Sequence, residues 1–138
     1  MNKVFIDSDI ILDVATGREP FYIDSTAVLS LVENEYALGV MSSNSITNIY
    51  YILRKISSGE KAKNFIKTIL NCITVISVEH EDIQKALESK FNDFEDGVQH
   101  FSAKRNRCDY IITRNIRDYV FSEIEVIEPK EFILLYKR

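Results

Sequence analysis

The sequence predicts a three-layer α/β/α protein, Rossmann-like, in which helices cover both faces of a central parallel sheet of about five strands. Short β-favouring runs alternate with helix-length segments along the chain. The length of 138 residues suits one domain with one interior, so we expect a single domain over residues 1–138. Hydrophobic residues make up 46% of the chain, which contains only four glycines and two prolines, so it can build a core.

The first elements are a strand, a loop and a helix. Val4–Ile6 is a short buried strand that ends at the acid-rich segment Asp7–Asp13, which we expect to be a loop. Breakers at Gly17–Pro20 precede a helix that ends near residues 33–35. A second apolar run at residues 36–41 predicts the next strand.

Two helices and a strand complete the middle of the chain. Ser42–Ser45 offers N-caps for a helix that carries a stripe on one face, composed of Ile46, Ile49, Leu53 and Ile56. Residues 57–60 break this helix, and apolar residues from 62 to 69 indicate another. Residues 73–76 then predict the third strand.

The remaining elements repeat the alternation. Apolar residues from 83 to 87 suggest a helix, and Asp93 can cap another that runs to about Arg107. Strands follow at residues 110–112 and 124–127, and Pro129 opens a short closing helix.

The charge and cysteine content limit the classes of function. Lysine and arginine total 17 against 21 acids, so the net charge is −4 and any nucleic-acid contact must be local. Cys72 and Cys108 lie far apart, which favours reduced thiols in the core. The segment Met1–Asp7 reaches an acid too soon for a signal peptide, and no run approaches the ~18 apolar residues of a membrane span. We therefore expect a cytoplasmic protein without a membrane segment.

Three acids are expected to meet at one edge of the sheet. Asp7 follows the first strand, Asp96 lies in the first turn of the helix after Asp93, and Asp118 follows the fourth strand. Carboxylates repel one another unless a cation lies between them, and hard oxygen ligands suit Mg²⁺ or Mn²⁺. Such an ion lowers the pKa of a bound water and clamps a phosphoryl oxygen, as phosphodiester hydrolysis requires. These residues predict a metal-dependent nuclease.

Three segments resemble the PIN domain, and the resemblance runs nearly end to end. They are Val4–Val14, Asp93–Asp96 and Ile111–Tyr119. The chain is most similar to single-domain bacterial PIN proteins of the VapC toxin type. That resemblance implies a Mg²⁺- or Mn²⁺-dependent ribonuclease that hydrolyses RNA phosphodiester bonds, forms a homodimer and is held silent by an antitoxin protein.

The resemblance also assigns roles to individual residues. Asp7 matches the first metal-binding acid, Asp96 the acid at the start of the later helix, and Asn115 with Asp118 the closing Thr-Arg-Asn-x-x-Asp element. Asn48 departs from the pattern, because the family usually has a glutamate there. An asparagine oxygen can ligate a metal or orient a water but adds no charge. Asp9 is a further metal-ligand candidate that would partly replace the missing acid.

Several polar residues have a simpler structural interpretation. Asp93 is expected to cap its helix, Asp13 to be solvated or paired, and Glu95 to face water. His100 has no partner in the sequence pattern, so we interpret it as a packing residue.

Basic and aromatic residues near the acids are candidates for RNA contact. Arg114 and Arg117 are the nearest cations, and Lys104–Arg107 is a second basic cluster. Tyr50 and Tyr51 suit the core, a dimer interface or stacking on a base.

Two other functions compete with the nuclease. Asn48 is also compatible with a PIN-fold binding or regulatory protein whose metal site is weakened or inactive. Asp7 and Asp9 resemble the Asp-x-Asp loop of haloacid-dehalogenase-like phosphatases, but Ile11 occupies the position where that family expects a hydroxyl.

Overall fold

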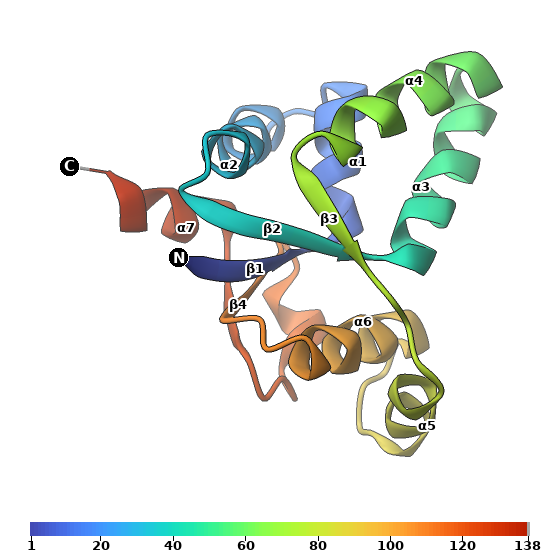
Figure 1. Ribbon diagram of the computed structural model, residues 1–138, viewed down its shortest axis with the longest axis vertical. Coiled ribbons are helices and arrows are strands. Elements are labelled where there is room, and N and C mark those ends of the chain that lie inside the picture. The colour runs from blue at the N-terminus through green and yellow to red at the C-terminus, as the bar shows by residue number, and fades with distance from the viewer. Residues whose placement is uncertain (138) are drawn as a thin grey trace.

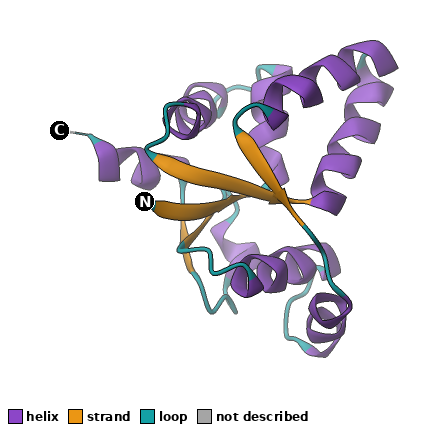
Figure 2. Ribbon diagram, viewed as in Figure 1, coloured by secondary structure: helices purple, strands orange, loops and turns teal. Residues whose placement is uncertain are grey.

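A five-stranded parallel sheet forms the centre of the computed structural model, which describes residues 1–137 (Figures 1 and 2). Its strands follow the order β3-β2-β1-β4-β5, and every neighbouring pair is parallel. The strands are β1 (Asn2–Ile6), β2 (Ala37–Ser42), β3 (Ile73–Ile76), β4 (Tyr110–Ile112) and β5 (Glu125–Ile127). The predicted three-layer α/β/α fold is confirmed.

Helices cover both faces of this sheet. In Figure 1, α1, α2, α3 and α4 lie on one side of it, and α5 and α6 lie on the other. The helices are α1 (Ser8–Thr16), α2 (Tyr22–Glu33), α3 (Ser43–Ile56), α4 (Gly59–Leu70), α5 (His80–Glu88), α6 (Phe94–Arg105) and α7 (Pro129–Tyr136), with a short 3-10 helix, η1, at Ile116–Tyr119. Within residues 1–137, no helix has both the length and the apolar character needed to cross a membrane.

The strands supply two separate cores because successive side chains of a strand point to opposite faces. Val4 and Ile6 of β1 join the larger core under α1–α4 and α7, whereas Phe5 joins the smaller core under α6. Ile112 and Ile111 of β4 divide in the same way. Both faces are buried, which explains why these strands read as continuous apolar runs.

The strand order determines where a ligand can bind. After β3 at one edge, the chain passes through α5 and α6 and returns on the far side of β1 to form β4. In open parallel sheets, a crevice forms at such a reversal, beyond the carboxyl ends of the strands. Asp7 stands at that end of β1, where its backbone N–H donates to the Ile112 carbonyl at 3.0 Å.

The predicted loop after β1 is wrong, because residues 8–16 form α1. The acids of this segment suggested a loop, yet Ile10, Ile11 and Val14 have the spacing of a helix face and pack into the larger core. Gly17 ends the helix in the left-handed conformation, with φ of 64°.

The predicted apolar stripe on α3 is one turn too long. Ile49 and Leu53 are buried, but Ile56 in the last turn is 62% exposed. The side chain at the end of the predicted stripe is therefore not covered by the neighbouring helices. Elsewhere the local expectations hold: Asp93 caps α6 through the Asp96 N–H at 3.0 Å, and Pro129 begins α7.

Candidate active site

The predicted acids meet in one cleft of about 460 Å³ at the carboxyl end of β1. Asp7, Asp96 and Asp118 all line it, although they come from three distant parts of the chain. The other lining residues are Ser8, Asp9, Leu12, Asn48, Ile49, Tyr51, Ile52, Asp93, Glu95 and Gln99. Six of the lining side chains are carboxylic acids, so this cleft is the candidate active site.

Asp7 lies at the floor of the cleft. Only 6% of the residue is exposed, and the Thr113 hydroxyl donates to its Oδ2 at 2.7 Å. Burial, assisted by the negative charge of Asp9, raises the pKa of Asp7 to about 6, although the hydrogen bond from Thr113 acts to lower it. The structure therefore holds this carboxylate in place while making its charge unfavourable.

Asp96, which also lines the cleft, is a second carboxyl group whose charged form is unfavourable there. Burial raises its pKa to about 7, and the negative charges of Asp93, Asp7, Asp118 and Glu95 add to the effect in that order. A nearby cation would remove this repulsion, because it favours the charged form of each carboxyl group.

The two asparagines predicted to belong to the site both donate hydrogen bonds to carboxylates. Asn115 donates from Nδ2 to Asp9 Oδ2 at 2.7 Å, and Asn48 donates from Nδ2 to Glu95 Oε1 at 3.0 Å. Asn115 is therefore placed behind Asp9, while Asn48 lines the cleft itself. The structure brings all five predicted site residues to this region, and their roles in chemistry stay predictions.

Glu95 is a cleft residue that the sequence interpretation missed. The sequence predicts that Glu95 faces water, but it is half-buried, lines the cleft and accepts from two amides, those of Asn48 and Gln99. Its position beside Asp96 was a local signal. Its hydrogen bond with Asn48 joins residues that are 47 positions apart, so the local sequence could not predict it.

Arg114 is engaged in a buried ion pair. Its Nε and Nη2 donate to the two oxygens of Asp13 at 2.8 and 3.3 Å, and its guanidinium carbon lies 4.2 Å from the centre of the Phe21 ring. The expectation that Asp13 is paired is confirmed. RNA contact by Arg114 stays a prediction, and its geometry indicates a structural role, whereas Arg117 is exposed.

Two of the three cations in the second basic cluster have internal partners, and the third, Arg107, is exposed. Lys104 pairs with Glu123 at 2.7 Å, and Arg105 pairs with Asp82 at 3.1 Å. His100 is buried and accepts at Nε2 from the Glu123 N–H, while burial lowers its pKa to about 4. Its interpretation as a packing residue is confirmed.

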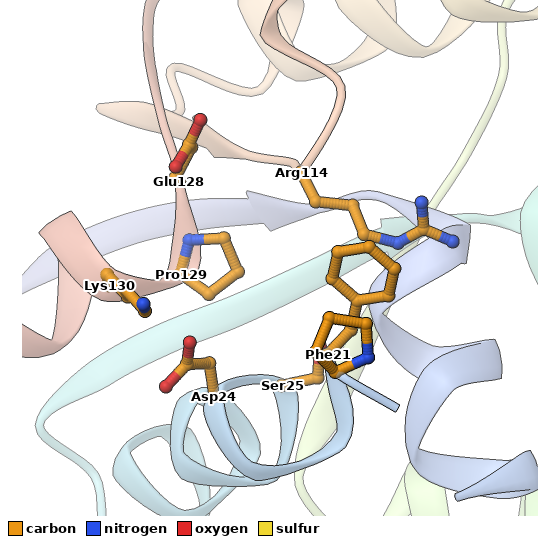
Figure 3. Close-up of a pocket in the computed structure, with 8 residues that line it drawn as sticks. Phe21, Asp24, Ser25, Arg114, Glu128, Pro129 and Lys130 are labelled. Atoms are coloured by element: carbon orange, nitrogen blue, oxygen red, sulfur yellow. The ribbon is translucent and has the colours of Figure 1, made fainter. Parts of the chain in front are cut away.

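A second cavity of about 280 Å³ lies between the starts of α2 and α7 (Figure 3). Asp24 of α2 and Lys130 of α7 border it, together with Glu128 and Arg114. Its charges are mixed, and its arginine is already paired with Asp13. The concentration of acids therefore favours the first cleft as the reactive site.

The donor groups of the cleft suit a hard divalent cation. Asp7, Asp9, Asp96 and Asp118 offer only oxygen atoms, which Mg²⁺ and Mn²⁺ prefer. As placed in residues 1–137, no three carboxylate, imidazole or thiol groups lie close enough together to enclose an ion. The carboxylate oxygens therefore suit the ion by their chemistry. To bind it, their side chains would have to turn toward one another.

Asp7→Asn is expected to stabilise the metal-free protein at pH 8 and not at pH 4. The folded protein binds the Asp7 proton more tightly than the unfolded chain, so the contribution of Asp7 to stability falls as the pH rises from about 4 through 6. Asparagine carries no charge and can still accept from Thr113. Urea unfolding in chelator should give a gain of roughly 1–3 kcal/mol at pH 8.

Asp24→Asn, which lies outside the cleft, controls for the loss of one negative charge. A difference between Asp7→Asn and the parent that stayed constant from pH 4 to pH 8 would contradict the assignment of a raised pKa to this carboxyl group.

Comparison with known proteins identifies the class. Residues 3–117 match the sequence model of the PIN domain, so the chain belongs to the PIN domain family. It is 33% identical over 136 residues to Ribonuclease VapC1 of Aquifex aeolicus (strain VF5), covering 94% of this chain and 92% of that protein.

Solved structures share the fold at low sequence identity. The DNA-bound VapBC structure from Salmonella typhimurium superposes with a TM-score of 0.70 at 13% identity, covering 94% of this chain and 99% of that one. VapBC2 from Rickettsia felis, bound to a promoter DNA fragment, gives 0.69 at 14% identity, covering 91% and 98%. VapC20 of Mycobacterium tuberculosis, described as a Sarcin-Ricin loop cleaving toxin, gives 0.63 at 10% identity, covering 78% and 86%.

Proposed function

We propose that this protein is a metal-dependent endoribonuclease and the toxin of a toxin–antitoxin pair. The observation that carries the proposal is the acid-lined cleft beside β1 and β4 of a PIN domain chain. The similarity to Ribonuclease VapC1 supports RNA as the substrate. We propose a cytoplasmic location as well, where such a protein would meet cellular RNA.

Asp7, Asp96 and Asp118 would hold Mg²⁺ or Mn²⁺, with Asp9 as an additional ligand. When bound, such an ion supplies a Lewis acid for the phosphoryl oxygens and lowers the pKa of a water molecule. The chain's own part is to position the ligands. Thr113 holds Asp7 by a hydrogen bond of 2.7 Å, and Asn115 holds Asp9 by another of the same length.

Residues around the acids suit contact with a single RNA strand. Tyr51 is exposed at the cleft and can stack on a base, whereas Tyr50 packs against the core. Arg117 is exposed next to Asp118 and can contact a phosphate. These side chains would orient the strand across the carboxylates.

We also propose two protein partners: an antitoxin and a second copy of this chain. The antitoxin is supported by similar structures described as VapBC complexes and as a toxin–antitoxin complex from Klebsiella pneumoniae. A homodimer is supported by two exposed apolar side chains of α3, those of Ile52 and Ile56.

The alternative is a PIN-fold binding or regulatory protein with an inactive metal site. Asn48 motivates it, since this residue adds no charge to the cleft. The family match over residues 3–117 favours the nuclease over the phosphatase interpretation.

The test is cleavage of a mixed cellular RNA pool by the purified protein with Mn²⁺ or Mg²⁺, compared with a chelator control. We expect cleavage only with metal. If the RNA pool remains intact under every metal condition, or if cutting persists in chelator, the metal-dependent nuclease is rejected and the binding protein becomes the better description.

A further inference from the structure

Glu95 is held in the acid cleft by two amide groups. Its Oε1 accepts from Asn48 Nδ2 of α3 at 3.0 Å and from Gln99 Nε2 of α6 at 3.3 Å. In the described chain, residues 1–137, both of its hydrogen bonds end on Oε1. Oε2 is therefore the oxygen that remains to meet a ligand in the cleft.

The orientation of Gln99 is itself determined by a buried partner. Gln99 is 2% exposed, and its Oε1 accepts from the Tyr119 hydroxyl at 3.2 Å. Because the amide oxygen is occupied by Tyr119, the amide nitrogen must be directed at Glu95. The Tyr119 hydroxyl also lies 3.5 Å from Asp96 Oδ1, so it is close to both acids although its one hydrogen is given to Gln99.

Glu95 keeps this place beside two other acids at the start of α6, although the start of a helix also favours acidic side chains. Asp93 and Asp96 flank Glu95 on the same helix end, and a flexible glutamate there would relieve the repulsion by turning to water. Two donors hold it among like charges instead. Asn48 stands where the resemblance expects a glutamate, and its N–H group fixes the position of a glutamate from the neighbouring helix.

We propose that Glu95 is a ligand of the divalent cation and supplies the carboxylate that position 48 lacks. Asn48 and Gln99 are positioning residues that hold Glu95 for this role. The negative charge that the family usually carries on α3, at position 48, would then come from Glu95 on α6. This inference rests on the proposed metal-dependent function and adds a residue to its site.

The test is calorimetric titration of the RNA-free protein with Mn²⁺, comparing the parent with Glu95→Gln. We expect Glu95→Gln to weaken Mn²⁺ binding by at least about 10-fold, since it removes a charged ligand. Glu81→Gln is the matched control, because Glu81 is an exposed glutamate paired with Lys85 on α5, and we expect its affinity to equal that of the parent. Thermal unfolding in chelator checks that each variant is folded.

A charge-relocation variant separates the role of the charge from a packing effect. Asn48→Glu combined with Glu95→Gln restores one carboxylate and one amide to the same two positions, and we expect it to regain most of the Mn²⁺ affinity. The proposal is overturned if Glu95→Gln binds Mn²⁺ as tightly as the parent, or if the double variant binds no better than Glu95→Gln. The proposed function survives either result, whereas a parent that binds no Mn²⁺ rejects both.

Discussion

Asp96→Asn is expected to reduce RNA cleavage by about 100- to 1,000-fold with either metal, because removing one charged ligand forfeits several kcal/mol of transition-state stabilisation. Asp96 is the acid on which the charges of the cleft converge, since four neighbouring carboxylates raise its pKa. Neutralising Asp96 is therefore expected to weaken the proposed metal binding.

The substitution leaves the local structure intact. Asp93 caps the helix through the backbone N–H of residue 96, which asparagine retains. The metal-free variant should therefore be at least as stable as the parent at pH 8.

The loss of activity is measured as the initial rate at which the parent and Asp96→Asn cleave a labelled RNA over a range of Mn²⁺ concentrations. Asp24→Asn removes the same charge outside the cleft and should cleave at the parental rate. Equal rates for the parent and Asp96→Asn would remove the cleft from consideration as the active site.

Arg114→Met is expected to lower the free energy of unfolding by about 3–5 kcal/mol, because it leaves the Asp13 carboxylate buried without its partner. Asp13 is 1% exposed, and both of its oxygens accept from the guanidinium. Methionine can still pack on Phe21, so the loss measures mainly the unpaired charge.

Urea unfolding at pH 7.5 in chelator measures this loss. Arg117→Met, at an exposed position nearby, should change stability by no more than about 0.5 kcal/mol. Arg114→Met combined with Asp13→Leu should recover most of the loss, since apolar residues of similar volume can replace a buried pair. If the double variant is less stable than Arg114→Met alone, the unpaired charge is not the cause.

The same ion pair connects stability to the site. Arg114 follows Thr113, which holds Asp7, and precedes Asn115, which holds Asp9. Anchoring Arg114 to α1 therefore fixes the segment from which both hydrogen bonds to the acids are made. A residue expected to contact RNA thus has a structural role next to the cleft.

The sequence alone predicted most of the strands and the meeting of the acids. Residues 73–76 and 110–112 form strands with the bounds expected from their apolar runs. Because parallel strands end at the same edge of a sheet, the positions of Asp7 and Asp118 after their strands were enough to bring them to one cleft. Such features depend on residues close together in the chain, where hydrophobic periodicity and capping act.

The tertiary structure decided which polar partners each acid has. Asp13 pairs with Arg114 across 101 residues, and Asn48 bonds to Glu95 across 47. A carboxylate in the sequence carries no local sign of whether it will face water, a cation or an amide, because its burial and its partners arise only when distant elements pack together. The fold class and the meeting of the acids in one cleft could therefore be predicted from local pattern, whereas the contacts of Glu95, Asn48 and Arg114 required the packed structure.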